Sequence, residues 1–229
     1  MSSNKRDYVS VTYNENDRPF TEYPDQLACY LVQRYNLTGK QKLLDLGCGR
    51  GEFLRGFMRH DLQGYGVDQS MLSTNICPDA EIKQSDLEKD NLPYDNNFFD
   101  VIFSKSVLEH FYYPENLVQE IYRILKPSGL VITMVPDWET VYKVFYNDYT
   151  HRTPFTKTSL KDIFVIHGFD SVESEKFRQL PLIWDIPWLL PISKLVAVIT
   201  PESMKKYSKF IRFSKEVMLL CSASKPKKI

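Results

Sequence analysis

Strand-like and helix-like patterns alternate between residues 42 and 135, and this alternation restricts the fold more than any other feature of the chain. Amphipathic patterns predict helices in this stretch, of which the strongest covers residues 115–125 and ends at the turn sequence Lys-Pro-Ser-Gly. Alternation of this kind favours an α/β fold with a parallel, doubly wound sheet and helices on both faces. Short apolar runs predict five buried strands here, at residues 42–46, 64–67, 81–84, 99–104 and 130–135.

The chain on either side of this stretch adds further elements to the same fold. Helices are predicted over residues 24–36 and 159–167. Two more strands, at 170–177 and 216–222, bring the expected sheet to seven strands. The apolar, proline-rich segment before the last strand predicts a helical insertion.

The length of the chain limits the number of domains. With 229 residues it is too short for two ordinary domains and a linker. We therefore expect a single domain over residues 1–229. Its parts are an N-terminal arm and helix (1–39), a core (40–178 and 213–225) and an insertion (179–212).

Charge and cysteine content exclude several classes of protein. Lys plus Arg and Asp plus Glu both number 29, whereas nucleic-acid-binding proteins usually carry a basic excess. The four cysteines are scattered, so neither a disulfide framework nor a zinc site is expected. The first twenty residues are polar and lack the apolar segment of a secretory signal. We expect a cytoplasmic protein without a nucleic-acid partner.

A glycine loop follows the first predicted strand, where Gly47, Gly49 and Gly51 alternate with other residues. Glycines at a strand-to-helix turn allow a tight bend and the close approach of a ligand to the backbone. The G-x-G-x-G spacing differs from the dinucleotide fingerprint G-x-G-x-x-G, and no P-loop lysine follows. Asp45 precedes the loop where dinucleotide sites normally have an apolar residue. A carboxylate there suits a ligand with a positive ammonium group better than one with a pyrophosphate.

Two further acids follow the next two predicted strands. Asp68 comes 21 residues after Gly47, where a carboxylate can accept both ribose hydroxyl protons. Asp86 follows the third strand and could accept a hydrogen bond from an adenine amino group. Open α/β sheets bind ligands at the carboxyl ends of their strands, so the three acids are expected to share one site. Each acid alone could be a helix cap or a turn residue, but three at matching strand ends are harder to explain in that way.

Four segments of the chain carry a family resemblance: LLDLGCGRGEFL, GYGVD, SDLEKDNLPYDNNFFDVIFSKSVLEH and ENLVQEIYRILKPSGLVITMVP. Together they resemble the class I S-adenosylmethionine-dependent methyltransferases, closest to the type 11/12 group that acts on small molecules. The resemblance is strong over residues 40–136, looser over 148–178 and 214–225, and absent from 180–212. It implies a Rossmann-like, doubly wound, mostly parallel seven-stranded sheet. It also implies S-adenosylmethionine as the methyl donor and S-adenosylhomocysteine as the product.

The resemblance also implies a role for each residue near the carboxyl ends of the first four strands. The glycine loop holds the methionine part, and the acid after the second strand takes the ribose hydroxyls. The acid after the third strand takes the adenine amine, and the serine that ends the fourth strand lies under the reacting methyl group. The implied cofactor-binding residues are Asp45, Gly47, Cys48, Gly49, Asp68, Gln69, Asp86, Leu87 and Ser104.

Two histidines are candidates for acid–base chemistry, which methyl transfer to a hydroxyl requires. His110 follows the fourth strand in SVLEHF, and in the family a histidine there often lines the cofactor without catalysing. His151 lies in DYTHRTPFT, which is similar to a pattern that borders the acceptor pocket in relatives. Asp148, three residues away, could orient His151. The alternative for this stretch is a structural turn before the next helix.

No metal site is expected. Ubiquinone-type O-methyltransferases of similar pattern carry E-V-L-E-H after the fourth strand and can hold a divalent metal there. In this chain Ser106 replaces the first of those carboxylates.

Other functions stay open on the residues alone. A cofactor-binding pseudo-enzyme or interaction protein could keep the same fold, although the intact acids speak against it. An NAD-dependent oxidoreductase is disfavoured by the glycine spacing and by Asp45. No pattern fixes the acceptor. An oxygen of a sugar or glycan-biosynthesis intermediate is expected, because a similar Pro/Trp-rich insertion accompanies methyltransferases of glycan and envelope biosynthesis.

The insertion and the residues after it allow several interpretations. Residues 181–200 are largely apolar, but three prolines, Asp185 and Lys194 interrupt the run, so a membrane-spanning helix is not expected. Residues 203–215 carry five basic side chains among aromatic and aliphatic ones, as in a basic amphipathic helix. The segment could be a lid over the acceptor, a homodimer surface or a peripheral membrane contact near a lipid-linked substrate. It could also be a packed insertion with a solvated basic face.

Overall fold

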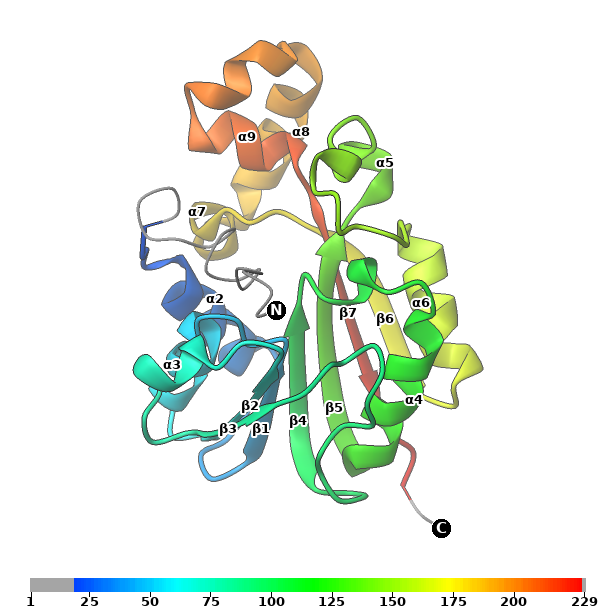
Figure 1. Cartoon of the computed structure of the whole chain (residues 1–229). Coiled ribbons are helices and arrows are strands. Elements are labelled where there is room, and N and C mark those ends of the chain that lie inside the picture. Colours follow the sequence, from blue (N-terminus) through cyan, green and yellow to red (C-terminus); the bar gives the residue numbers. More distant parts are fainter. Residues whose placement is uncertain (1–18, 228–229) are drawn as a thin grey trace, which may run out of the picture. The chain divides into compact units, whose positions relative to one another are not determined.

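A computed structural model describes residues 19–227 of the chain. Its strands are β1 (Lys42–Leu46), β2 (Gln63–Asp68), β3 (Glu81–Gln84), β4 (Phe99–Lys105), β5 (Leu125–Pro136), β6 (Asp170–Phe177) and β7 (Met218–Ser224). They form one sheet in the order β3-β2-β1-β4-β5-β7-β6 (Figure 1). Strand β1 is parallel to β2 and β4, and β2 to β3, whereas β7 is antiparallel to both of its neighbours. The predicted Rossmann-like, mostly parallel seven-stranded sheet is confirmed.

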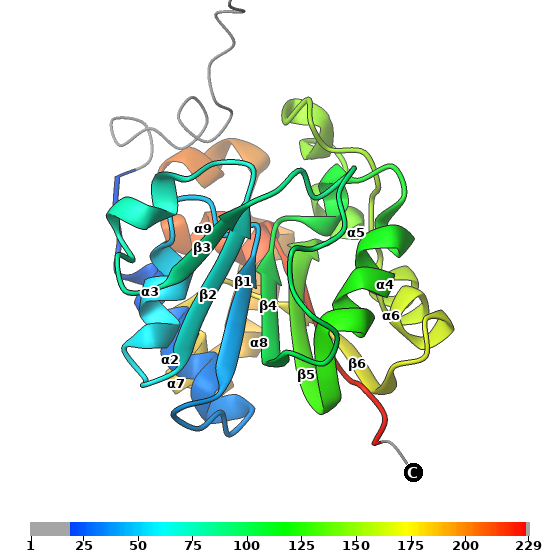
Figure 2. The ribbon, with the colours of Figure 1, turned by 60° about the horizontal axis from the view of Figure 1, so that its bottom comes forward.

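The chain divides into two compact units, and the first contains the described residues up to Ser104 together with Ile124–Lys126. Figure 2 shows its strands β3, β2, β1 and β4 side by side in this order. Its helices are α2 (Tyr23–Arg34), α3 (Glu52–Met58) and the 3-10 helix η1 (Leu72–Asn75). Helix α2 packs closely on α3, because a Cβ at Gly56 would lie only 3.0 Å from the Cβ of Ala28.

The core of this first unit is formed by apolar side chains of its strands and helices. Burial of a leucine or phenylalanine side chain contributes about 1.5–3 kcal/mol. The rings of Phe57 and Phe103 pack edge to face, with 5.0 Å between their centroids. The fully buried side chains of the unit include Leu27, Leu31, Leu43, Leu44, Leu46, Leu54, Phe57, Phe99, Ile102 and Phe103.

The second unit contains Lys105–Arg123 and the described residues from Pro127 onward. Strand β7 pairs with β5 on one side and with β6 on the other. The helices of this unit before β6 are η2 (Leu108–His110), α4 (Pro114–Ile124), α5 (Trp138–Val141), η3 (Phe145–Asn147) and α6 (Lys157–Ile166). Those between β6 and β7 are α7 (Pro181–Asp185), η4 (Pro187–Leu189), α8 (Leu190–Ile199), η5 (Glu202–Lys206) and α9 (Lys209–Lys215).

Strand β5 begins earlier than the sequence predicts. The Lys-Pro-Ser-Gly turn ends helix α4 as expected, but the strand starts at Leu125 and the expected start was residue 130. Pairing with the end of the chain accounts for residues 128 and 129 of this extension: the Ser128 N–H donates to the Lys225 carbonyl at 2.8 Å, and the Lys225 N–H donates to the Gly129 carbonyl at 3.0 Å. A turn signal reports local preference and contains no information about this distant partner.

The predicted helical insertion is present, and α9 extends it to Lys215. Within the described residues, the longest helix of the insertion is α8 with ten residues. No helix in the described part of the chain is long and apolar enough to cross a membrane. The single-domain organisation and the role of the insertion as a lid stay predictions.

Candidate functional site

The glycine loop bends the chain between β1 and α3 through left-handed backbone conformations. Gly47, Gly49 and Gly51 have φ angles of 74°, 53° and 85°. The N–H groups of Gly47 and Cys48 donate to the Val67 carbonyl at 2.8 and 3.3 Å, which fixes the start of the loop on β2. A Cβ built at Gly49 would meet no atom within 4 Å, so the loop presents bare backbone to open space. Backbone N–H groups before a short helix are suited to a close ligand.

Asp68 lies at the carboxyl end of β2 and organises the same loop. Its Oδ2 accepts a hydrogen bond from the Gly49 N–H at 2.8 Å, and its Oδ1 accepts one from the Ser70 N–H at 2.8 Å. The residue is 9% exposed. The carboxylate therefore stands between the glycine loop and the turn that follows β2, with a fixed orientation.

Asp45 is almost completely buried near the end of β1, and its Oδ2 has no hydrogen-bond partner. Burial, followed by the nearby charge of Asp68, raises the pKa of this carboxyl to about 7, although the backbone N–H of Leu54 acts in the opposite direction. A buried carboxylate oxygen without a partner is costly unless a cation or donor reaches it. The site is therefore prepared for a positively charged or donating ligand group.

Asp86 follows β3 and lies in a more exposed network. Its Oδ2 accepts from Lys89 Nζ at 2.6 Å, and its Oδ1 accepts from Gln69 Nε2 at 3.2 Å. The Lys89 ammonium is the main reason that the pKa of Asp86 lies below its ordinary value. Gln69 is held in turn, because its carbonyl accepts from the side chain of Gln84. Leu87, next in the chain, is half-buried.

Ser104 and Cys48 complete the predicted set in this unit. Ser104 is 1% exposed near the end of β4, where it is paired in register with Leu46. The thiol of Cys48 lies 3.4 Å from Ser73 Oγ, and burial raises its pKa well above the ordinary range. The thiol is thus protonated, so Cys48 serves through its backbone and packing. The structure brings the predicted residues of β1, β2 and β4 to matching ends of parallel strands.

Gly49→Ala tests whether the open backbone of the loop holds a ligand. The methyl group has room, but a φ of 53° disfavours any side chain, which costs roughly 1 kcal/mol. We expect a loss of S-adenosylmethionine affinity of about tenfold or more in a calorimetric titration, because the methyl group occupies the space of the ligand. The melting temperature should fall by only about 2–4 °C.

Gly168→Ala is the matched control. Gly168 has a φ of 85°, and a Cβ there would lie 3.7 Å from its nearest neighbour, on Tyr122. It should lose similar stability and keep full affinity. Equal affinities of Gly49→Ala and the unmodified chain would show that no ligand occupies the space above the loop.

A second cluster lies in the other unit, around η2 and the segment before α6. His110 Nδ1 lies 2.9 Å from Thr150 Oγ1, whose hydroxyl donates to Asp148 Oδ1 at 2.5 Å. Because the threonine proton is used by the carboxylate, Thr150 accepts from His110 Nδ1–H. Burial, followed by the nearby His151, lowers the pKa of His110 to about 4, so its ring is neutral.

A backbone carbonyl group orients the ring of His151. Its Nδ1 lies 2.7 Å from the Phe145 carbonyl, which can only accept, so Nδ1 carries the hydrogen and the neutral ring has its lone pair on Nε2. The His110 and His151 rings lie 4.8 Å apart between centroids. Asp148 is connected through Thr150 to His110, and the Phe145 carbonyl has a direct contact with His151. The suggestion that Asp148 could also orient His151 stays a prediction.

Glu109 was given no role from the sequence, where it stands in SVLEHF before His110. Its side chain is fully buried, neither oxygen has a hydrogen bond of normal geometry, and burial raises its pKa to about 8. Its carbonyl accepts from the N–H groups of Arg152 at 2.7 Å and Thr153 at 3.1 Å, which ties the histidine segment to η2. The available signal was the comparison with E-V-L-E-H, in which Glu109 matches the second carboxylate.

Donor atoms of Glu109, His110 and His151 lie within 4.8 Å of one another. A carboxylate and two imidazoles are ligands that a divalent transition metal accepts. No metal was expected from the sequence because Ser106 replaces a carboxylate, whereas the structure adds His151 to this group. The absence of a metal stays a prediction.

Comparison with known proteins gives the family. A family model described as a methyltransferase domain matches residues 44–133, which include the glycine loop, Asp68 and Asp86. An uncharacterized protein of Methanocaldococcus jannaschii is 30% identical over 181 residues, which cover 78% of this chain and 76% of that protein. The chain spans 36 to 56% of the length of three further curated relatives.

Two solved structures share the fold over nearly the whole chain. One is a protein described as a methyltransferase, solved in complex with the Haloferax volcanii Trm112 methyltransferase activator. It is 20% identical to this chain with a TM-score of 0.71, and the match covers 97% of this chain and 99% of the other. The other is an S-adenosylmethionine-dependent methyltransferase from Archaeoglobus fulgidus, with 22% identity, a TM-score of 0.66 and coverage of 96% and 100%. From the family match, the relative and the fold, this chain belongs to the class I S-adenosylmethionine-dependent methyltransferases of the type 11 group.

Proposed function

We propose that the chain transfers a methyl group from S-adenosylmethionine to a small-molecule acceptor, at an oxygen of a sugar or glycan-biosynthesis intermediate. The observation that supports an oxygen acceptor is the orientation of His151. Its Nδ1–H is bound by the Phe145 carbonyl, which leaves Nε2 as a proton acceptor. A hydroxyl must lose a proton to become a competent nucleophile, and a positioned imidazole is the commonest group to take it.

The cofactor fits the residues of the first unit. Its methionine part is assigned to the bare backbone of Gly47, Cys48 and Gly49, with the ammonium group near the unpartnered Oδ2 of Asp45. Both features, an orphaned buried oxygen and an open backbone cradle, are what a cationic and compact ligand part requires.

The nucleoside part is assigned to the strands beside β1. Asp68, with Gln69 flanking, takes the ribose hydroxyls, and Asp86 with the Leu87 backbone takes the adenine edge. The Lys89 contact of Asp86 is exposed, so an adenine amine can compete for that carboxylate at little cost. Ser104, buried at the end of β4, is assigned to the floor beneath the methyl group.

The bound cofactor supplies a methyl group that is already activated by its sulfonium charge. The residues of this chain then contribute alignment, exclusion of water and one proton transfer. The methyl group would be supplied by the cofactor held on the residues of the first unit, and His151 Nε2 would take the proton that the acceptor hydroxyl loses. The Phe145 carbonyl keeps its hydrogen bond to Nδ1–H throughout, so the resulting imidazolium is stabilised in place.

His110 is assigned a positioning role next to this base. Its pKa of about 4 keeps the ring neutral, so it adds no positive charge next to a protonated His151. Asp148 holds this arrangement through Thr150. A second candidate function is that of a methyltransferase that needs a protein partner for turnover. It is considered because a structurally similar protein was solved in complex with an activator.

Titration of the purified chain with S-adenosylmethionine at two pH values tests the proposal. The pKa of about 7 at Asp45 means that the carboxyl is mostly protonated at pH 5.5 and half ionised at pH 7. The cofactor ammonium stays charged below about pH 8, so affinity should rise about tenfold from pH 5.5 to pH 7. Asp45→Asn should bind more weakly and with no such rise.

The two parts of this titration have separate consequences. If neither S-adenosylmethionine nor S-adenosylhomocysteine bound at millimolar concentration, the proposed function would be wrong. A pH-independent affinity would remove only the ammonium contact of Asp45. Transfer of labelled methyl groups to a panel of nucleotide sugars and polyprenyl-linked sugars would then identify the acceptor.

A further inference from the structure

Helix α8 directs its large aliphatic side chains outward. Ile192, Leu195, Val198 and Ile199 are all exposed, with Val198 82% accessible. At 3.6 residues per turn they occupy an arc of about 120° on one side of the helix. Trp188 in η4 and Tyr207 after η5 are exposed as well, at 70% and 75%. Such a stripe normally faces a protein core, and here it faces solvent.

Small polar residues occupy the inner side of the same helix. Ser193 and Ser214 are both 0% exposed, and their hydroxyls form a hydrogen bond of 2.7 Å that joins α8 to α9. The Lys215 ammonium also donates to the Ala197 carbonyl at 2.7 Å. Two polar contacts thus fix the rotation of α8 with its apolar face outward. Figure 1 shows α8 and α9 next to each other in one helical cluster.

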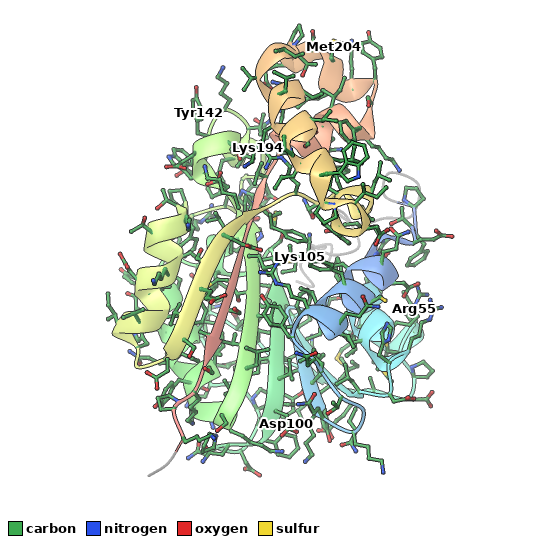
Figure 3. All side chains as sticks on the ribbon, turned by 180° about the vertical axis from the view of Figure 1, so that it is seen from behind. Arg55, Asp100, Lys105, Tyr142, Lys194 and Met204 are labelled. Carbon is green, nitrogen blue, oxygen red and sulfur yellow. The ribbon has the colours of Figure 1, made fainter. Side chains whose placement is uncertain are left out.

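Positive charge surrounds this face. Residues 181–215 contain six basic and two acidic side chains, a net charge of +4 in a chain whose total formal charge is zero. Among the described residues, no carboxylate forms an ion pair with Lys194, Lys206 or Lys209. Figure 3 labels Lys194 on α8 and Met204 on η5, within the same cluster. The basic side chains that do pair, Lys205, Arg212 and Lys215, are held by Glu202 and Glu216.

We propose that the outward face of α7–α9 docks in the plane of a lipid bilayer that contains anionic headgroups. Aliphatic side chains enter the boundary between headgroups and acyl chains, aromatic side chains lie at the interface, and lysines meet the phosphates. A helix of ten residues is about 15 Å long, which suits an in-plane position. Anionic lipid is the occupant that complements both the apolar stripe and the +4 charge.

Two other occupants fit the face less well. A second copy related by two-fold symmetry would place the same positive patch against itself, and like charges would repel across an apolar interface. A protein partner is disfavoured because protein interfaces are depleted in lysine relative to the rest of the surface. Lipid avoids both difficulties, since the lysines remain in water at the headgroup level.

This inference goes beyond the proposed methyl transfer and deepens it in one respect. A chain held at a bilayer would act on acceptors that are themselves lipid-linked, the class in which polyprenyl-linked sugars fall. Vesicle binding is independent of turnover, and cofactor titration of the same variants shows whether the donor site is intact. Failure of the two proposals can therefore be distinguished.

Co-sedimentation with phosphatidylcholine vesicles, with and without phosphatidylglycerol, tests the inference. The unmodified chain should bind the anionic vesicles and release them at high salt, because screening weakens the lysine contacts. Leu195→Glu with Val198→Glu should reduce partitioning by roughly tenfold or more. Lys194→Ala, Lys206→Ala and Lys209→Ala should each reduce it by roughly fivefold.

Ile166→Glu is the matched control, because Ile166 is an exposed aliphatic residue of α6. It should bind vesicles as the unmodified chain does, and all variants should keep their cofactor affinity. Absence of binding to anionic vesicles would overturn the inference, as would equal loss in Ile166→Glu. Sedimentation velocity that showed a dimer broken by Val198→Glu, or capture of a protein partner lost in the same variant, would assign the face to that partner instead.

Discussion

Asp68→Ala is expected to weaken S-adenosylmethionine binding by about a hundredfold to ten-thousandfold. In the proposed site its carboxylate accepts two ribose hydroxyls, and each hydrogen bond to a charged group contributes about 1.5–3 kcal/mol. The substitution also removes the acceptor for the Gly49 and Ser70 N–H groups, so the glycine loop loses the contact that orients it. Calorimetric titration with cofactor and with S-adenosylhomocysteine measures the effect.

Two variants separate the binding role from general stability. Asp68→Asn keeps one acceptor oxygen and should lose less affinity than Asp68→Ala. Asp100→Ala removes another carboxylate of the same unit, which accepts from the Lys42 N–H and from Lys126 at the opposite ends of the strands (Figure 3). It should destabilise the fold without changing affinity. Unchanged affinity in Asp68→Ala would contradict the assignment of the ribose site.

His151→Ala is expected to lower kcat for an oxygen acceptor by about a hundredfold to ten-thousandfold, the usual contribution of a positioned general base. Cofactor affinity should stay unchanged, because no cofactor contact is assigned to His151. The measurement is the initial rate of labelled methyl transfer to an acceptor from the panel, with cofactor at saturation.

His167→Ala provides the control for this histidine. His167 has the same kind of contact, with its Nδ1 2.7 Å from the Ile163 carbonyl, but it lies at the end of α6. It should retain the full rate. Treatment with EDTA should leave the rate unchanged, because the proposed reaction uses His151 as the proton acceptor and requires no metal ion. A His151→Ala variant with the unmodified rate would remove His151 as the base, and a rate abolished by EDTA would assign the Glu109–His110–His151 group to a metal.

The placement of the residues proposed for the donor side could be predicted because its determinants are local. A glycine loop after an apolar strand and an acid at the end of the next strand are each visible in a few consecutive letters. A parallel sheet then places the carboxyl ends of its strands together without further information. Three strands, β1, β3 and β6, have the bounds that the sequence predicts.

The histidine cluster could be predicted only in part. The sequence points to His110 and His151 as candidates and to Asp148 as a residue that could orient His151, which stays a prediction. It does not show that Asp148 is connected through Thr150 to His110, because proximity in the chain does not report which atoms meet in space. The contacts that decide the pairing run over forty residues from His110 to Thr150 and through a backbone carbonyl of Phe145. Every residue has a backbone carbonyl, so the residue types do not show which carbonyl accepts the hydrogen bond.

The rotation of α8 about its own axis could not be predicted from the sequence either. Its periodicity shows an apolar face, and a face of that kind usually packs inward. The deciding contact is a hydrogen bond between two serines, Ser193 and Ser214, which are 21 residues apart. Serine is common on helix surfaces, so neither residue suggested the inner side.

If the cofactor ammonium lies at the buried Asp45 as proposed, the folding equilibrium depends on the supply of cofactor. A carboxyl with a folded-state pKa of about 7 binds its proton more tightly when folded than when unfolded. Its contribution to stability is therefore present at low pH and is lost as the pH rises from about 4 to about 7. At neutral pH the empty protein bears this penalty, and a cationic ligand removes it. Cells depleted of S-adenosylmethionine would thus hold a chain that melts earlier and is degraded faster than the loaded one.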